Sequence, residues 1–432
     1  EIPVSNSGSA GGRQPSANGL PFKNASYIQN NNLNSYVLEL NSVFGTRASN
    51  NFVVGWNRFR DFRESGGGVF PLVDILSGPT GVTRTSFGYE PFTANNVLDQ
   101  DVYQVTNNFT YYAGKHSVTA GANFEYFQFA NGFTPRFYGD FRFPSFSAFY
   151  NSFPAGTRTP VGESTGLGRP TRYELTYSAV PGVAVPIAEL EVGQFGLYLQ
   201  DEFQITDRLK VTHGIRFDVP YYPKKLARNE KVEGLTFANG EKIDVSTFAK
   251  ARALWSPRIG FNYDVMGDNK IQLRGGTGIF TGRIPFVWLS NQASNNGILF
   301  GSILQTGNLT NSNPADDYVN FPFSPDPAKY IPANATLPST VLINSTDRNF
   351  KFPQVWRSSF AADIDLYRGY ILTLEGIYSE DINAVYHRDL NFKAPRGTLD
   401  TPNDKRELFA GSAASNRINS SVTNAIQLTN TN

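Results

Sequence analysis

The sequence contains no cysteine, one methionine and three histidines among its 432 residues. Without cysteine, disulfides, thiol catalysis and thiolate metal sites are all excluded. Charged residues make up 17% of the chain and the formal net charge is +1. Because no basic run is longer than Lys224-Lys225 or Lys405-Arg406, the sequence predicts no nucleic-acid partner. No stretch approaches the ~18 continuous apolar residues of a membrane helix, so a helical membrane protein is excluded as well.

The two ends lack the usual signs of a complete chain. Residue 1 is Glu, with no basic and apolar leader after it, so we expect any signal peptide to have been removed or to lie upstream. The segment Ser5 to Asn34 is rich in Ser, Gly and Asn and is expected to be irregular. Residues 425–432 form a polar run without an evident closing hairpin strand. We therefore expect this sequence to be a piece of a longer chain.

What the sequence has in abundance is aromatic residues, at 14%, and segments in which apolar and polar side chains alternate. In the clearest segment, Gly193 to Val219, apolar residues fall on one parity and polar residues on the other, with a turn at Thr206-Asp207-Arg208-Leu209. Only Asp201 and His213 interrupt the apolar stripe. Since successive side chains of a strand point to opposite faces, this segment predicts a hairpin with one apolar and one polar face.

Four further hairpins share this plan: Ser35–Phe44 with Asn51–Phe62, Asp101–Tyr112 with Ser117–Phe129, Trp255–Val265 with Ile271–Phe280, and Val355–Leu366 with Ile371–Glu380. Each turn is short and polar, whereas connections of roughly sixty, thirty-five and seventy residues follow Ala130, Val219 and Phe280. This inequality is typical of an antiparallel transmembrane β-barrel with short periplasmic turns and long extracellular loops. We therefore predict an all-β fold with about ten legible strands, and one partial barrel domain over residues 1–432.

Several phrases in and beside these strands are informative in combination. They are YQVTNNFT at 103–110, LQDEF at 199–203, WSPRIGFNYD at 255–264, LRGGTGIFTGR at 273–283, FPLVDIL at 70–76, FGYEPFT at 87–93 and PFVWLSNQ at 285–292. Together they resemble TonB-dependent outer-membrane receptors, especially the Oar-like group of Bacteroidetes. The resemblance implies a 22-stranded barrel of which this sequence is a fragment from the middle. It also implies a plug domain, an N-terminal segment that contacts the TonB complex, and an immunoglobulin-like extension, none of which is recognisable in these residues.

Residues with catalytic or metal-binding chemistry are few. His116, His213 and His387 are expected in a turn, in a strand and beside a loop, and none has a second histidine at metal-ligand spacing. Gly276-Thr277-Gly278 is similar to a phosphate-binding loop, but this segment alternates like a strand, where small residues allow close backbone approach. The sequence therefore predicts no enzyme, no cofactor and no catalytic, cofactor-binding or metal-binding residue, and it leaves the substrate-binding residues unknown.

Carboxylates on the predicted strands either line a polar lumen and select solutes or are ordinary solvated wall residues, and we favour the second interpretation. They are Glu125, Asp201, Glu202, Asp218, Asp264, Asp363, Asp365 and Glu375. The parity of Asp201 places it among apolar neighbours. We therefore expect Asp201 near an interface, at a bulge or against a partner.

Aromatic residues near strand ends are expected to form a girdle at the membrane interface: Phe195, Tyr198, Phe203, Phe217, Trp255, Phe261, Tyr263, Trp356, Phe360, Tyr367 and Tyr370. Loop aromatics are expected to pack a long loop onto itself, with a sugar-stacking platform as the alternative: Phe137, Tyr138, Phe141, Phe143, Phe146, Phe149 and Tyr150. The Asn- and Asp-rich stretches 291–296 and 311–317 match no calcium-loop spacing and are expected to be loops with turns.

The function predicted from these features is energised uptake of a solute through a plugged barrel in the bacterial outer membrane. The expected partners are outer-membrane lipid, the plug domain, the TonB complex through an N-terminal segment outside this sequence, and an unidentified extracellular solute. Peptide, glycan, siderophore and protein cargo all stay open. A porin-like wall that serves surface adhesion or protein secretion without import is the alternative, and a soluble secreted β-sandwich or β-solenoid is a second rival.

Overall fold

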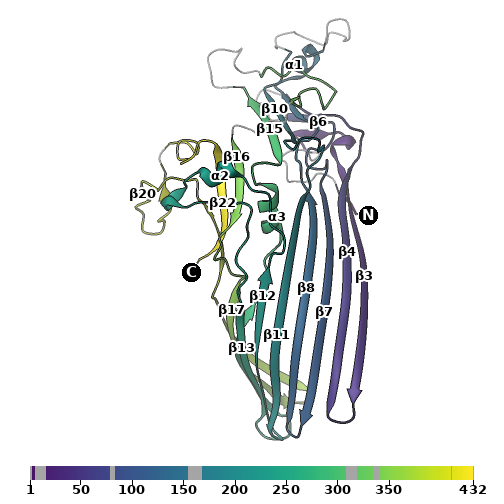
Figure 1. Ribbon diagram of the computed structural model, residues 1–432, viewed down its shortest axis with the longest axis vertical. Coiled ribbons are helices and arrows are strands. Elements are labelled where there is room, and N and C mark those ends of the chain that lie inside the picture. Colours follow the sequence, from purple (N-terminus) through teal and green to yellow (C-terminus); the bar gives the residue numbers. More distant parts are fainter. Residues whose placement is uncertain are drawn as a thin grey trace.

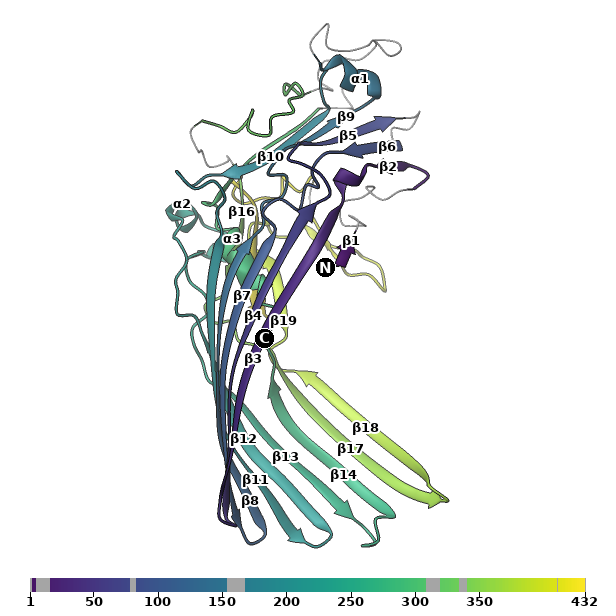
Figure 2. The same ribbon diagram turned by 90° about the vertical axis from the view of Figure 1, so that its right-hand side faces the viewer.

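The computed structural model describes residues 2–4, 16–77, 83–153, 168–307, 319–333, 340–409 and 411–431. Long strands run side by side and are joined by tight turns at one end, which we call the turn end (Figure 1). Short strands and helices gather at the other end, the outer end (Figure 1). Seen from the side, the long strands form one strongly curved sheet (Figure 2).

The strands are β1 (Ile2–Val4), β2 (Gly19–Pro21), β3 (Tyr27–Phe44), β4 (Ala48–Ser65), β5 (Leu72–Ser77), β6 (Thr83–Phe87), β7 (Val97–Ala113), β8 (His116–Gly132), β9 (Asp140–Phe143), β10 (Arg172–Ser178), β11 (Ala188–Thr206), β12 (Leu209–Tyr221), β13 (Leu254–Asp264), β14 (Ile271–Thr281), β15 (Phe300–Thr306), β16 (Val341–Thr346), β17 (Gln354–Tyr367), β18 (Tyr370–Asp381), β19 (Val385–Asp389), β20 (Gly397–Thr398), β21 (Glu407–Leu408) and β22 (Val422–Asn430). The helices are η1 (Lys23–Ala25), α1 (Phe146–Asn151), α2 (Glu230–Gly234), η2 (Ala238–Gly240) and α3 (Val287–Ser294).

Within the described ranges, eleven strands form one antiparallel sheet, which we call the wall, in the order β1-β3-β4-β7-β8-β11-β12-β13-β14-β17-β18. The five predicted hairpins are confirmed as β3–β4, β7–β8, β11–β12, β13–β14 and β17–β18. Gly45 and Gly114 occupy tight turns with φ of 59° and 60°. This left-handed backbone region is what two- and three-residue hairpin turns require.

Several wall strands extend further at the outer end than the alternation predicts. β3 begins at Tyr27, so the expectation that Ser5 to Asn34 is irregular is wrong for its last residues. Residues 5–15 lie outside the described residues. The extension escaped detection because it carries Asn on both faces, and strand pairing with β4 continues there without an apolar stripe.

The long connections at the outer end have folded cores of their own. β15, β10, β9, β5, β6 and β2 form a second sheet around Phe141, Phe143 and Tyr173. β16, β22 and β19 form a third sheet. β22 pairs in parallel with β16 and antiparallel with β19, so the C-terminal run, expected to lack a closing hairpin strand, contains a strand of this outer sheet and not of the wall.

Candidate functional site

The register of the wall separates a polar face from an apolar face. Gln194 pairs with Glu125 on β8, and every second residue from there shares that face. The residues on either side of Gln194 in β11, such as Phe195, point to the opposite, apolar face. Leu199 on this apolar face is 52% exposed. Seven of the eight predicted carboxylates fall on the polar face by this register: Glu125, Glu202, Asp218, Asp264, Asp363, Asp365 and Glu375.

Paired charges occupy the upper part of the polar face. Arg216 donates from Nε and Nη2 to the two carboxylate oxygens of Asp218 at 2.8 and 2.7 Å. Gln194 donates to Asp218 at 3.4 Å, and Arg283 pairs with Glu125. Glu125, Gln194 and Asp218 are buried, and ion pairs held in this way are fixed by several bonds at once. This cluster, which we call the polar floor, joins β8, β11 and β12 to Arg283, two residues past the end of β14.

An apolar segment covers the polar face directly above this floor. Residues 284–293, which include most of α3, are called the cap. The cap brings Ile284 and Leu289 against Phe127 and Leu190, which lie on the polar face by the register of β8 and β11. Asn131 of β8 donates to the Ser290 hydroxyl at 2.7 Å, which attaches the cap to the wall. The upper polar face is therefore closed off by packed side chains from a connecting loop.

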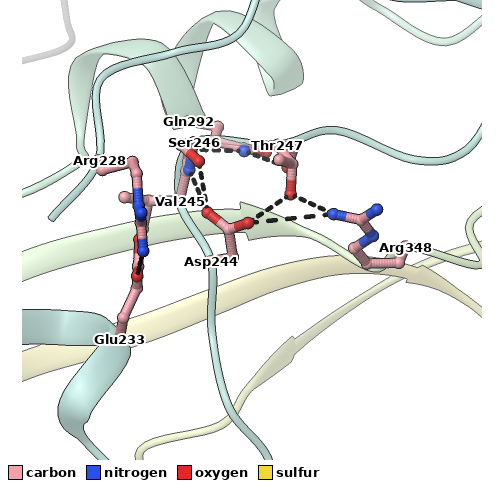
Figure 3. A network of polar contacts seen from close by, with 8 residues as sticks. All are labelled: Arg228, Glu233, Asp244, Val245, Ser246, Thr247, Gln292 and Arg348. Carbon is pink, nitrogen blue, oxygen red and sulfur yellow. Dashed lines mark hydrogen bonds and ion pairs between the residues drawn. The ribbon is translucent and has the colours of Figure 1, made fainter. Parts of the chain in front are cut away.

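A buried glutamine fixes the cap to the rest of the outer end (Figure 3). Gln292 is fully buried and donates to the carbonyl oxygens of Val245 and Thr247 at 3.0 and 2.9 Å. The Gln292 side-chain oxygen Oε1 accepts a hydrogen bond from the hydroxyl of Thr346 on β16 at 2.7 Å. Stretch 291–296 was expected to be a loop, but its first four residues are the end of α3, so the expectation is wrong for them. The side chains of Asn295 and Asn296 donate to Asn344 and to the carbonyl oxygen of Ala293.

The same network holds a carboxylate in its charged form (Figure 3). Asp244 accepts hydrogen bonds from the Ser246 amide and hydroxyl at 2.9 and 2.6 Å and from the Thr247 hydroxyl at 3.0 Å. Burial alone would raise the pKa of Asp244, but these bonds and the nearby Arg348 guanidinium together lower it. The ionised Asp244 carboxylate therefore stabilises the loop around residues 244–247, to which Gln292 is hydrogen-bonded.

A row of aromatic rings crosses the apolar face about midway along β3 and β4. Tyr36, Trp56, Tyr103 and Tyr126 are register partners on β3, β4, β7 and β8. Their ring centroids are 5.4, 6.2 and 6.4 Å apart along the row. Trp56 Nε1 donates to Asp101 at 2.9 Å, so the polar edge of the ring points to charged residues. Rings with one apolar and one polar side are typical of a membrane interface.

This row corrects the predicted girdle in part. Tyr198 does not belong to it, because Tyr198 lies on the polar face and donates to Asn108. The four rings of the row were not predicted, since each stands in a strand interior and becomes a belt only when the register aligns them. Among the loop aromatics, Phe141 and Phe143 are buried in the outer-end core, as loop packing predicts, whereas Phe146 is 44% exposed.

Asp201 lies on the apolar face, as its parity predicts, and has a partner there. His116 Nδ1 and Asp201 Oδ2 are 2.7 Å apart, and the His116 ring stacks on Phe203 with centroids 4.2 Å apart. His213 is the register partner of Asp201 on β12. Asp201 and His213 line a groove of about 960 Å³, whose other lining residues come mainly from the apolar face of six strands. A groove on this face suits lipid chains and is no candidate site for a polar solute.

The remaining predicted residues find structural roles. His387 lies in β19 beside Trp288, away from the other two histidines, and burial lowers the pKa of His387. In the described ranges no three His, Cys, Asp or Glu side chains gather as a metal site. Gly276 and Gly278 lie in β14, where a Cβ would come 3.0 Å from the carbonyl oxygens of Ile259 and Pro257, so close backbone approach is confirmed. The stretch 311–317 lies outside the described residues.

A family model described as an outer membrane beta barrel domain matches residues 5–432. The chain belongs to this outer-membrane β-barrel family. The predicted β fold with a large antiparallel sheet is confirmed, and this barrel chain resides in the bacterial outer membrane and contacts membrane lipid. Short turns of such barrels face the periplasm and long loops face outward, so the outer end is extracellular. Within the described ranges, the helices are all too short or too polar to span a bilayer.

The fold of this chain is similar to that of a solved outer-membrane transporter, and two further solved structures give lower scores. The outer membrane transporter YddB from Escherichia coli has a TM-score of 0.54 at 11% identity, covering 95% of this chain and 38% of that one. A mutant of the ferric enterobactin receptor PfeA from Pseudomonas aeruginosa has 0.44 at 10%, covering 93% and 39%. The closed ferric-catecholate import receptor Fiu from E. coli K12 has 0.43 at 13%, covering 88% and 43%. The chain thus spans about two fifths of the length of these proteins. A comparison with curated proteins gives no match.

Proposed function

We propose that residues 1–432 form part of the barrel domain of an Oar-like TonB-dependent receptor, which takes up a solute with energy delivered from the inner membrane. The 22-stranded closure, the plug and the TonB-contacting segment belong to the proposal and lie outside this sequence. The observation that supports it best is the polar face, whose buried ion pairs lie beneath an apolar cap. A wall that is polar and yet blocked suits a gated pathway better than an open pore.

The absence of cysteine from this sequence gives a direct test. A single cysteine at Gln200 would report on the polar face, because this half-buried side chain has no hydrogen bond within the described residues. The substitution is made in the full-length protein, freed of any cysteine elsewhere. Intact cells are then exposed to a membrane-impermeant maleimide, with and without the TonB complex and with and without an uncoupler.

A gated pathway predicts that Gln200→Cys is labelled much faster when the TonB complex is present and energised. Equal labelling in all conditions would overturn the proposal and favour an adhesion or secretion barrel. Two matched positions serve as controls. Ile215→Cys on the apolar face, where Ile215 is 45% exposed, should stay unlabelled behind lipid, and Phe146→Cys at the outer end should be labelled always.

A further inference from the structure

A cavity of about 600 Å³ lies at the outer end, beside the cap. Four parts of the chain line it: the outer ends of β7 and β8, the α3 helix with the turn that follows it, the β10–β15 pair, and the start of β16. Figure 1 shows α3 below β10 and β15 and next to β16. The volume falls within the ~300–1,000 Å³ range of small-molecule sites. The cavity stands at the extracellular mouth of the polar face, since the cap that borders it packs on that face.

The lining of this cavity carries no charge. None of its residues in the described part of the chain is Asp, Glu, Lys, Arg or His. This contrasts with the neighbouring outer sheet, where Arg136 pairs with Glu174 at 3.0 Å. An ion that entered the cavity would lose hydration and find no opposite charge, which costs several kcal/mol. The lining therefore selects an uncharged solute.

Side-chain amides dominate the polar part of the lining. Asn131 and Asn295 are each held by a donated hydrogen bond, to Ser290 at 2.7 Å and to Asn344 at 3.0 Å. The side-chain amide oxygens of Asn131 and Asn295 accept no hydrogen bond from the residues that the structure describes. Asn291, one turn before Asn295 on α3, makes no side-chain hydrogen bond in those residues at all. The fold therefore places these three Asn side chains in the lining and leaves hydrogen-bonding groups on each of them for a ligand.

An aromatic ring and hydroxyl groups complete the lining. Phe133, just past the end of β8, is 45% exposed and belongs to none of the apolar cores described above. Thr176 and Ser302 add hydroxyls from β10 and β15. An amide offers a donor and an acceptor side by side, which matches two adjacent hydroxyls of a ligand. The face of an exposed ring suits the C–H side of a flat, saturated ring.

We propose that this cavity binds a neutral, polyhydroxylated solute, with an oligosaccharide as the chemical class. The hydroxyls of this solute form hydrogen bonds with the Asn291 side chain and donate to the side-chain amide oxygens of Asn131 and Asn295. Phe133 stacks on one sugar ring. The assignment of this solute as the cargo rests on the proposed function. Binding itself does not, because the cavity is built from the outer end alone.

The test uses the purified full-length protein in detergent and fluorescence anisotropy with reducing-end-labelled hexasaccharides. The panel contains neutral glucose, mannose, xylose and N-acetylglucosamine oligomers, together with an oligogalacturonate as the anionic counterpart. At least one neutral oligomer should bind with an affinity that stays constant between low and high salt. Failure of all neutral oligomers to bind, or preferred salt-sensitive binding of the oligogalacturonate, would overturn the proposal.

Two substitutions locate the site, and each has a matched control. Asn291→Ala and Phe133→Ala should each weaken binding of the neutral oligomer about tenfold. The controls are Asn403→Ala, an exposed Asn without a side-chain bond in the described residues, and Phe146→Ala, whose ring is as exposed as that of Phe133. Equal effects of variants and controls would refute the site. Binding without energised labelling of Gln200→Cys would sink the transport proposal and leave this one standing.

Discussion

Replacing Gln292 by methionine should release the cap while leaving the wall intact. The side chain keeps its length, but the carbonyl oxygens of Val245 and Thr247 lose their donor and the Thr346 hydroxyl loses its acceptor. Each buried hydrogen bond contributes about 1–1.5 kcal/mol, so the three together predict a loss of roughly 3–4.5 kcal/mol in the free energy of local opening. Each ~1.4 kcal/mol is a factor of ten, so the open population should rise by about two to three orders of magnitude.

Hydrogen exchange measured by mass spectrometry on the full-length protein in detergent checks this prediction. Peptides from 243–248 and 341–346 should lose protection in Gln292→Met, whereas β8 and β11 should exchange as in the wild type. Gln305→Met is the control, because Gln305 is exposed and has no side-chain bond in the described residues. Unchanged exchange in both outer peptides would refute the reasoning that this one amide holds the cap.

Three further outcomes follow from the same structure. The pKa of Asp244 is lowered in the folded protein, so the ionised carboxylate stabilises the fold above the unfolded-state pKa near 4, and this stabilisation is lost as the pH falls through the lower folded-state pKa. Proteolysis of the outer loops should therefore be faster at pH 3–4 than at neutral pH in the wild type. The same change of pH should have a much smaller effect in Asp244→Asn. Asp201→Leu leaves His116 on the apolar face without its partner, so the temperature at which heat changes the migration of the barrel in gels should fall. That temperature should recover in the double variant Asp201→Leu, His116→Phe. An unchanged temperature in the single variant would contradict a stabilising role for the His116–Asp201 pair. Trp56→Ala removes stacking on both sides and should cost about 2–3 kcal/mol in urea unfolding from liposomes, whereas a loss below ~0.5 kcal/mol would show that the row is not structural.

The hairpins were predictable because lipid on one side of a strand and polar groups on the other impose an alternation with a period of two. The same reasoning fails where a strand leaves the membrane. The first residues of β3 have no apolar stripe, and β22 belongs to an outer sheet whose neighbours come from distant parts of the chain. Strand existence follows from local pattern, whereas strand ends outside lipid depend on pairing.

The candidate sites were less predictable, because their members meet only in the folded chain. Arg283 and Glu125 are 158 residues apart, so no local spacing indicates their ion pair. Asp201 was identified by its parity alone, yet its partner His116 could not be chosen without the register of β8 against β11. The neutral cavity draws on five separate segments between residues 96 and 342, and its defining property, the lack of charge, belongs to no single one of them.

The aromatic row has a consequence for what can touch this protein from outside. β4 continues from Trp56 to Ser65 beyond the row, which at ~3.3 Å per residue is roughly 30 Å of strand. This extension pairs with β3 on one side and, over most of its length, with β7 on the other, so it is a stiff part of the sheet rather than a flexible linker. The extracellular sheets are thereby raised clear of the lipid headgroups. Bulky objects such as an antibody, a phage tail or a long polymer can reach them without pushing into the bilayer surface.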